Sequence, residues 1–188
     1  MNIVEYLEKS EGVIAAARSY PGVRRAEDAI DAIVAAFVAD KPMLVCGNGG
    51  SASDAMHIAG ELVGRFLKER KALNCICLSS NPSVLTAWSN DYSYETVFSR
   101  QVEAHGAPGG LILGISTSGN SLNVLEAFRV AKNIGMTTVG LTGEGGGKMA
   151  ELTDVLIDVP SRSTPMIQQV HICLYHHICE QVEIRLAA

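Results

Sequence analysis

Short apolar runs alternate with longer amphipathic stretches along most of the chain. The runs fall at residues 43–46, 75–78, 111–115, 137–141 and 155–159. Each has the length of a strand that is buried on both faces of a parallel sheet. Helical spacing of apolar residues marks the stretches between and after the runs, notably 52–68, 121–133 and 165–186. This alternation predicts βαβ units, and therefore an α/β fold with a doubly wound five-stranded parallel sheet and helices on both faces.

Two further helices are expected ahead of the sheet. Residues 3–19 and 24–39 carry Ile, Val, Leu and Ala at helical spacing, and Pro21-Gly22 separates the two segments. No linker or low-complexity segment interrupts the 188 residues, a length that suits one full-sized core. We therefore expect a single domain over residues 1–188, with the N-terminal helices in 1–40 and an α/β core in 41–188.

Composition and charge exclude several classes of function. Hydrophobic residues make up 47% of the chain and charged residues 19%, with a net charge of -5, which is typical of a globular protein. There is no basic stripe of the kind that binds nucleic acid. The N-terminus lacks a signal-peptide pattern, and no apolar run approaches the roughly 20 residues of a membrane span. We expect a cytoplasmic protein without a nucleic-acid or membrane partner.

Polar loops follow three of the predicted strands. They span residues 47–54, 116–121 and 143–147. In open α/β sheets, ligands bind beyond the carboxyl ends of the strands, where these loops are expected to lie. The third loop fails the spacing of a nucleotide-binding P-loop, and we interpret it as a flexible connecting turn.

Loop 116–121 has the chemistry of a phosphate site. It offers four hydroxyls, from Ser116, Thr117, Ser118 and Ser121, at the entry to a predicted helix. The free N–H groups of a helix N-terminus attract phosphate through hydrogen bonds and the helix dipole. Simple N-capping by Asn120 or Ser121 is the alternative, although capping needs only one such residue.

The glycine-rich loop 47–54 is a second candidate for ligand binding. Gly47, Gly49 and Gly50 allow backbone amides to approach a ligand closely. Their spacing fits neither the dinucleotide fingerprint nor the Walker pattern, which argues against a nucleotide. Because hydroxyl donors dominate these loops and Lys and Arg are scarce, a small phosphate ester is the favoured ligand.

The helix predicted after this loop carries a candidate catalytic pair. His57 and Glu61 are four residues apart, so they share one face of the helix. Such a pair can ligate a metal or act as an acid–base couple, and an ordinary surface pair is the alternative.

Taken together, these segments resemble the sugar isomerase (SIS) superfamily and, within it, the phosphoheptose isomerases. The resemblance runs over nearly the whole chain and includes Asn90-Asp91-Tyr92. The Ser-Thr-Ser-Gly-Asn-Ser loop alone indicates only the superfamily. Its combination with the His57/Glu61 helix and with a final helix that carries Gln168, His171 and His176 is more specific.

The resemblance implies a flavodoxin-like SIS domain with three αβα layers. It implies conversion of D-sedoheptulose 7-phosphate to D-glycero-D-manno-heptose 7-phosphate through an enediol(ate), the first step of nucleotide-activated heptose biosynthesis. It also implies one Zn²⁺ per subunit and a homotetramer with interfacial active sites. Matched positions for substrate contacts are Asn48, Gly49, Gly50, Ser51, Asp91, Ser116, Thr117, Ser118, Ser121 and Gln168. Matched metal positions are His57, Glu61, Gln168 and His176, with Glu61 as the hypothetical base and His176 as the acid.

Two features complicate this assignment. The chain departs from the family's pattern at Met56, Gly60, Pro165, Met166 and Gln169, which affects the choice of sugar. In addition, Gln168 and His176 are eight residues apart, about 12 Å along a regular helix. Either the helix starts after Gln168, or one of the two serves a neighbouring subunit.

Two other functions remain open: a non-catalytic SIS-fold regulator that binds the replication initiator protein, and another sugar-phosphate isomerase or lyase of the superfamily. Retention of His57, Glu61 and His176 favours the enzyme. An oligomer is favoured because the final helix is apolar around much of its circumference and needs cover on more than one side. The apolar residues are Ile167, Val170, Leu174, Tyr175, Ile178, Val182, Ile184 and Leu186.

Overall fold

Five parallel strands form one sheet in the computed structural model, which describes residues 1–187. The strands are β1 (Met43–Gly47), β2 (Cys75–Cys77), β3 (Leu111–Ser116), β4 (Thr137–Thr142) and β5 (Val155–Asp158). Their spatial order is β2-β1-β3-β4-β5, and each neighbouring pair is parallel. The predicted doubly wound sheet is therefore confirmed. Its strand order reverses between β1 and β3, the position at which open α/β sheets bind ligands.

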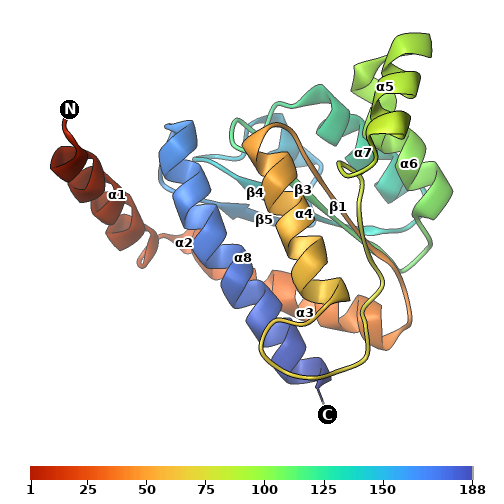
Figure 1. Cartoon of the computed structure of the whole chain (residues 1–188), viewed down its shortest axis with the longest axis horizontal. Helices are drawn as coiled ribbons and strands as arrows, with labels where there is room; N and C mark the ends of the chain where they lie inside the picture. Colours follow the sequence, from red (N-terminus) through yellow and green to blue (C-terminus); the bar gives the residue numbers. More distant parts are fainter. Residues whose placement is uncertain (188) are drawn as a thin grey trace.

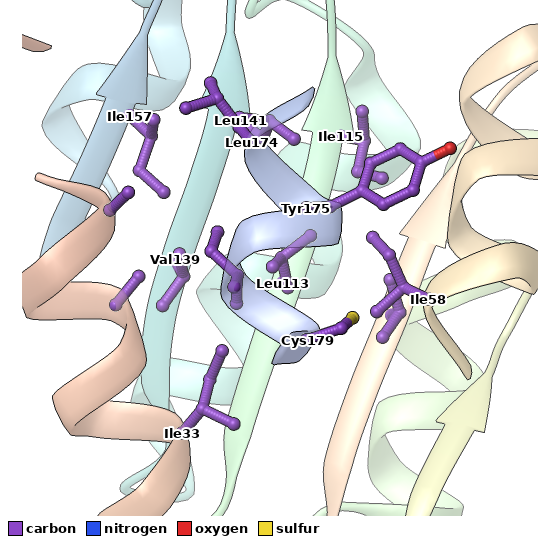
Figure 2. Close-up of a cluster of buried hydrophobic side chains, with 14 of the residues drawn as sticks. Ile33, Ile58, Leu113, Ile115, Val139, Leu141, Ile157, Leu174, Tyr175 and Cys179 are labelled. Atoms are coloured by element: carbon purple, nitrogen blue, oxygen red, sulfur yellow. The ribbon is translucent and has the colours of Figure 1, made fainter. Parts of the chain in front are cut away.

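Helices cover both faces of the sheet (Figure 1). One face is covered by α3 (Ala26–Val38), α4 (Gly50–Val63) and α8 (Thr164–Leu186), and the other by α6 (Val97–His105) and α7 (Leu122–Asn133). Each face has its own core, because successive strand residues point in opposite directions. Leu113 of β3 packs in the first core and Ile112 in the second. Figure 2 shows the first core, where Ile33, Ile58 and Leu174 come from the three covering helices.

The remaining helices lie at the ends of the sheet. They are α1 (Ile3–Ala17), α2 (Pro21–Arg24) and α5 (Pro82–Asp91), with 3-10 turns at Tyr94–Thr96 and Gly147–Glu151. Helix α1 projects away from the sheet and contacts α8 (Figure 1). Within residues 1–187, no helix has the length and apolar character that crossing a membrane would need.

Several boundaries differ from the sequence predictions. The expected break at Pro21-Gly22 is a one-turn helix, since a Pro at the first helical position is favourable. Helices α5 and α6, between β2 and β3, were not among the predicted helices. The helix predicted over 52–68 starts earlier, at Gly50, and ends earlier, at Val63.

Helices α4 and α8 lie side by side and run in the same direction (Figure 1). Gln168 of α8 contacts Gly50 at the start of α4. Further along, Tyr175 contacts His57. Beyond the end of α4, the Glu183 side chain binds the backbone of the following segment. These contacts form an interface between α4 and α8, here called the α4–α8 seam, which extends over the whole length of α4.

Glu183 explains why α4 stops where it does. Its carboxylate accepts hydrogen bonds from the backbone amides of Phe66, Leu67 and Lys68, at 2.8, 2.5 and 2.7 Å. Those amides bind Glu183 rather than helix carbonyls, so the chain leaves the helix. The Arg70 guanidinium lies 3.2 Å from the same carboxylate, and both side chains are buried. Burial alone would raise the pKa of Glu183, but the three amides and Arg70 together hold that pKa below its usual range.

Replacing Glu183 by Gln should lower the free energy of unfolding by about 3 kcal/mol, because the substitution leaves a buried Arg70 without its counter-charge. Urea denaturation measures this loss. The matched control is Glu69→Gln, since Arg65 and Glu69 are also 3.2 Å apart but their side chains are 58% and 86% exposed. That variant should lose less than about 1 kcal/mol. Equal losses in the two variants would contradict the structural role of Glu183.

Candidate active site

The loop between β3 and α7 presents hydroxyls around a helix N-terminus. The Ser116 and Ser121 hydroxyls hydrogen-bond each other at 2.8 Å, and Ser118 is exposed. Neither of the predicted side-chain caps forms. Ser121 occupies the N-cap position but makes no side-chain bond to the helix backbone, and the Asn120 side chain binds Ser118 and Lys148 instead. The hydroxyls and first amides of α7 are thus arranged for an anion.

Close contacts with the segment after β4 hold this loop in place. Gly119 has φ +65, and a Cβ atom there would lie 1.9 Å from the carbonyl oxygen of Gly146. The Asn120 side chain accepts a bond from the Lys148 amide at 3.1 Å, and the Met149 amide donates to the Gly119 carbonyl at 2.9 Å. The segment after β4, predicted to be a flexible turn, is therefore attached to the hydroxyl loop and supports it.

The turn between β1 and α4 is tighter than the sequence indicated. Gly47 ends β1 and only Asn48 and Gly49 connect it to α4, since residues 50–54 already belong to the helix. A Cβ atom on Gly47 would lie 2.5 Å from the backbone of Ser51, so glycine is needed there. Ser51 is buried at the start of α4, next to β1, and β1 pairs directly with β3.

Asn48 joins the two loops. Its side chain and that of Asn123, on α7, exchange two hydrogen bonds of 2.9 Å. The Tyr94 hydroxyl donates a third bond, of 2.7 Å, to the Asn48 carbonyl oxygen. These bonds use both lone pairs of the Asn48 oxygen and one of its two N–H groups. Sequence reasoning missed Asn123 and Tyr94, because a lone buried Asn or an exposed Tyr has no motif of its own.

The predicted His57/Glu61 pair forms on one face of α4. His57 Nε2 and Glu61 Oε1 are 3.1 Å apart, at a partly exposed position. The His176 ring lies against the His57 ring with centroids 5.0 Å apart, so α8 supplies the third predicted group. Phe66 packs on the other side of His176, with centroids 5.9 Å apart. The structure thus brings His57, Glu61 and His176 together.

Two further polar residues lie behind this cluster, and sequence reasoning assigned no site role to either. The Tyr175 oxygen is 3.1 Å from His57 Nδ1, and its hydroxyl donates to the buried Asp54 carboxylate at 3.4 Å. Burial raises the pKa of Asp54, although the Tyr175 hydrogen bond and His57 act in the opposite direction. Burial and then the Asp54 charge raise the pKa of Tyr175, which keeps its proton at neutral pH.

Gln168 and His176 belong to one continuous helix, because α8 begins at Thr164. The suggestion that the helix starts after Gln168 is therefore wrong. The Gln168 amide lies beside Gly50, where an added Cβ atom would come within 2.4 Å of it. His176 faces His57 about two turns further along. Gln168 thus lies at the loop end of the α4–α8 seam and His176 at its middle.

Asp91 is not brought to this cluster. It is the exposed last residue of α5, and its carboxylate accepts a bond from the adjacent Asn90 side chain at 3.0 Å. Trp88, on the same helix, packs against its neighbours. Its indole N–H donates to Thr96 at 2.8 Å, and its ring stacks on Tyr92 with centroids 4.2 Å apart.

The departures from the family's pattern lie mostly outside this site. Met166 is buried and accepts a hydrogen bond from Ser10, on α1, at 3.7 Å. Gln169 donates to the hydroxyl of Tyr6, also on α1, at 3.3 Å. Gly60 lies within α4 with open space around its Cα, so it does not break that helix. Met166 and Gln169 thus contribute to the contact between α1 and α8.

Comparison with known proteins identifies the class. The model of the SIS domain family matches residues 5–143, which include both loops and the whole of α4. The chain is 52% identical to the phosphoheptose isomerase of Crocosphaera subtropica over 165 residues, covering 88% of this chain and 84% of that protein. It therefore belongs to the phosphoheptose isomerase family of SIS domain proteins.

Solved structures agree with this assignment. The phosphoheptose isomerase of Neisseria gonorrhoeae superposes with a TM-score of 0.90 at 38% identity, over 96% of each chain. The phosphoheptose isomerase of Francisella tularensis gives the same TM-score at 33% identity, over 96% of this chain and 95% of that one. The expected SIS fold is thus confirmed over nearly the full length.

Substitution of Gly119 by Ala tests how the hydroxyl loop is held. It should lower the free energy of unfolding by about 3 kcal/mol, since a left-handed backbone strain adds to a backbone clash. Gly145→Ala is the matched control. Gly145 also has a positive φ, +80, but open space around it, so only about 1 kcal/mol should be lost. Thermal and urea denaturation measure both values, and an undisturbed Gly119→Ala would contradict this geometry.

Proposed function

We propose that the protein is an aldose–ketose isomerase that converts D-sedoheptulose 7-phosphate to D-glycero-D-manno-heptose 7-phosphate. One observation carries this proposal: a family member has His57 and Glu61 in contact on α4, the helix that starts at the glycine-rich turn, and His176 of α8 lies against His57. The relatives described above are named as enzymes, so the replication-initiator regulator is not the favoured alternative.

The phosphate end of the substrate is assigned to the two loops. The hydroxyls of Ser116, Thr117, Ser118 and Ser121, with the first amides of α7, provide neutral donors for a phosphate dianion. Ser51, Asn48, Gly49 and Gly50 flank the neighbouring strand end. Their neighbour Gln168 is assigned to the sugar. Asp91 is assigned to a sugar hydroxyl in a neighbouring subunit's site, because it lies apart from the cluster in its own chain.

The chemistry requires one base and one acid. Glu61 takes a proton from the carbon beside the substrate carbonyl and returns it to the neighbouring carbon, after an enediol(ate) forms. His176 moves a proton between the two substrate oxygens. The His57 ring fixes the Glu61 carboxylate through the contact at 3.1 Å. In the forward direction the proton leaves C1 of the ketose and returns to C2, and the reverse reaction of the aldose moves it from C2 to C1.

A zinc ion fits part of this donor set. Imidazole nitrogens and carboxylates are common zinc ligands, whereas an amide such as that of Gln168 is uncommon. Within residues 1–187 there is no ready-made group of three or more His, Cys, Asp or Glu side chains around one point. His57 and Glu61 would hold the ion, with His176 and Gln168 as further ligands. A bound zinc ion would polarise the substrate carbonyl.

Glu61→Gln should lower kcat by a factor of about 10²–10⁴, since it removes the base while keeping the shape of the side chain. Sedoheptulose 7-phosphate binding, measured by calorimetry, should be retained. Turnover is followed by NMR of the two heptose phosphates. The control is Glu126→Gln on the outer surface of α7, which should keep normal turnover. A fully active Glu61→Gln enzyme would refute the proposed base.

We also propose a homotetramer with interfacial sites, on grounds that differ from the sequence argument. Most of the apolar surface of α8 is buried within the chain, and Ile172 and Ile184 are its exposed large hydrophobic residues. The large exposed apolar surface is instead on α1, which contacts α8 with one side only. Its exposed members are Met1, Ile3, Val4, Leu7 and Ile14. A patch of this kind is typical of a protein–protein interface.

Val4→Glu should therefore dissociate the tetramer, because it places a charge within the apolar face of α1. Sedimentation velocity measures the change. Val38→Glu is the matched control, since Val38 is 72% exposed and Val4 59%, and it lies alone at the end of α3. A monomeric unsubstituted protein, or equal effects of both variants, would count against this interface.

The remaining assignments follow from this function. An enzyme acting on a soluble sugar phosphate works in the cytoplasm, where such intermediates are made. We propose that residues 1–188 act as one SIS domain, since α3 packs in the same core as α4 and α8, and α1 contacts α8.

A further inference from the structure

Both ring nitrogens of His57 have a partner, and the two partners differ in kind. Nε2 lies 3.1 Å from the Glu61 carboxylate, on the accessible side. Nδ1 lies 3.1 Å from the Tyr175 oxygen, on the buried side. The Tyr175 hydroxyl in turn donates to the Asp54 carboxylate at 3.4 Å. A chain of three side chains therefore leads from the buried Asp54 to the imidazole.

The direction of donation along this chain follows from chemistry. An ionised carboxylate only accepts hydrogen bonds, so the Tyr175 proton points to Asp54. The Tyr175 oxygen then presents a lone pair to His57, and Nδ1 must carry the proton. In a neutral imidazole the other nitrogen, Nε2, is left with a free lone pair.

We infer that Asp54 and Tyr175 are positioning residues that hold His57 as its Nδ1–H tautomer, with the Nε2 lone pair aimed at the space shared with Glu61. Two acceptors, a lone pair and a carboxylate, then face each other across 3.1 Å. A proton on Nε2 or a cation bound between the two groups makes this contact favourable. The zinc ion proposed for this site would then meet an Nε2 lone pair that is already oriented toward Glu61. This inference deepens the proposed zinc-assisted isomerase and rests on it.

The surroundings of Tyr175 suit this role. Its ring is buried among the aliphatic side chains of the first core, and its oxygen points away from them (Figure 2). The Tyr175 ring also meets the rings of His57 and His176 edge-on, with centroids 5.3 and 5.0 Å apart. A side chain held so firmly can fix the plane of a neighbouring imidazole. Outer partners of this kind commonly orient metal-binding histidines.

Asp54 is placed to act only through Tyr175. It is 8% exposed, and its second carboxylate oxygen has no hydrogen-bond partner among the described residues. A buried carboxylate with an unused oxygen is unfavourable for folding. Through its hydrogen bond with Tyr175, this buried carboxylate orients the hydroxyl that faces His57.

The first test compares the zinc affinity of Tyr175→Phe with that of the unsubstituted protein. Phe keeps the ring and its packing and removes only the hydroxyl, so Zn²⁺ should bind at least about 10-fold more weakly. Competition titration with a chromogenic chelator measures Kd. Tyr20→Phe is the matched control, because the Tyr20 hydroxyl donates to Asp158 at 2.9 Å elsewhere in the fold. That variant should keep the original Kd. A loss of thermal stability in Tyr175→Phe with an unchanged Kd would overturn the inference.

The second test needs no metal and no activity. In metal-free Glu61→Ala, neither a carboxylate nor a metal ion contacts Nε2. The hydrogen bonds from Asp54 through Tyr175, here called the relay, then set the tautomer of His57. Long-range ¹H–¹⁵N spectra at alkaline pH should show the proton on Nδ1, and the added Tyr175→Phe substitution should release this preference. A proton on Nε2 in Glu61→Ala would overturn the inference. If the unsubstituted protein bound no Zn²⁺ but His57 carried Nδ1–H, the zinc part of the proposed function would fail while the relay stood.

Discussion

The candidate active site depends on the parallel packing of α4 against α8. Helix α4 begins at the glycine-rich turn and carries His57 and Glu61, but their fixed partners come from α8, more than 100 residues later. The contact is anchored at both ends. Gln168 lies against Gly50 at one end, and Glu183 holds the chain that leaves α4 at the other. Helix α8 thus completes a site that α4 cannot form alone.

This arrangement divides the site into two parts with different physical origins. The part that we assign to the phosphate is made by backbone, at the strand ends of β1 and β3, where glycines permit close approach and hydroxyls supply neutral donors. The acid–base part is made by side chains in the α4–α8 seam. Helix α4 links them, because its first turn follows β1 and its middle carries the reacting groups. A fixed helix therefore sets the distance between the phosphate and the reacting carbon.

The sequence predicted the sheet well because all five strands are apolar runs with a clear length. It placed the two loops at neighbouring strand ends, because each follows directly on one of the apolar runs that form β1 and β3. It could not predict the end of α4 at Val63, since the cause is Glu183, 117 residues from Phe66 in the chain. Asn123 and Tyr175 were missed for a related reason. Each resembles an ordinary core or helix residue until a distant partner is known.

The buried polar groups of the seam separate an enzyme from a scaffold with the same fold. Among residues 1–187, one carboxylate oxygen of Asp54 has no hydrogen-bond partner, and the Tyr175 hydroxyl points away from the aliphatic core. Apolar residues of similar size would satisfy the packing and avoid this desolvation. A helix interface that served only stability or subunit assembly would not need this row of hydrogen-bonded side chains. Its alignment on His57 Nδ1, opposite the side that faces Glu61, instead agrees with the proposed role of this pair in proton transfer.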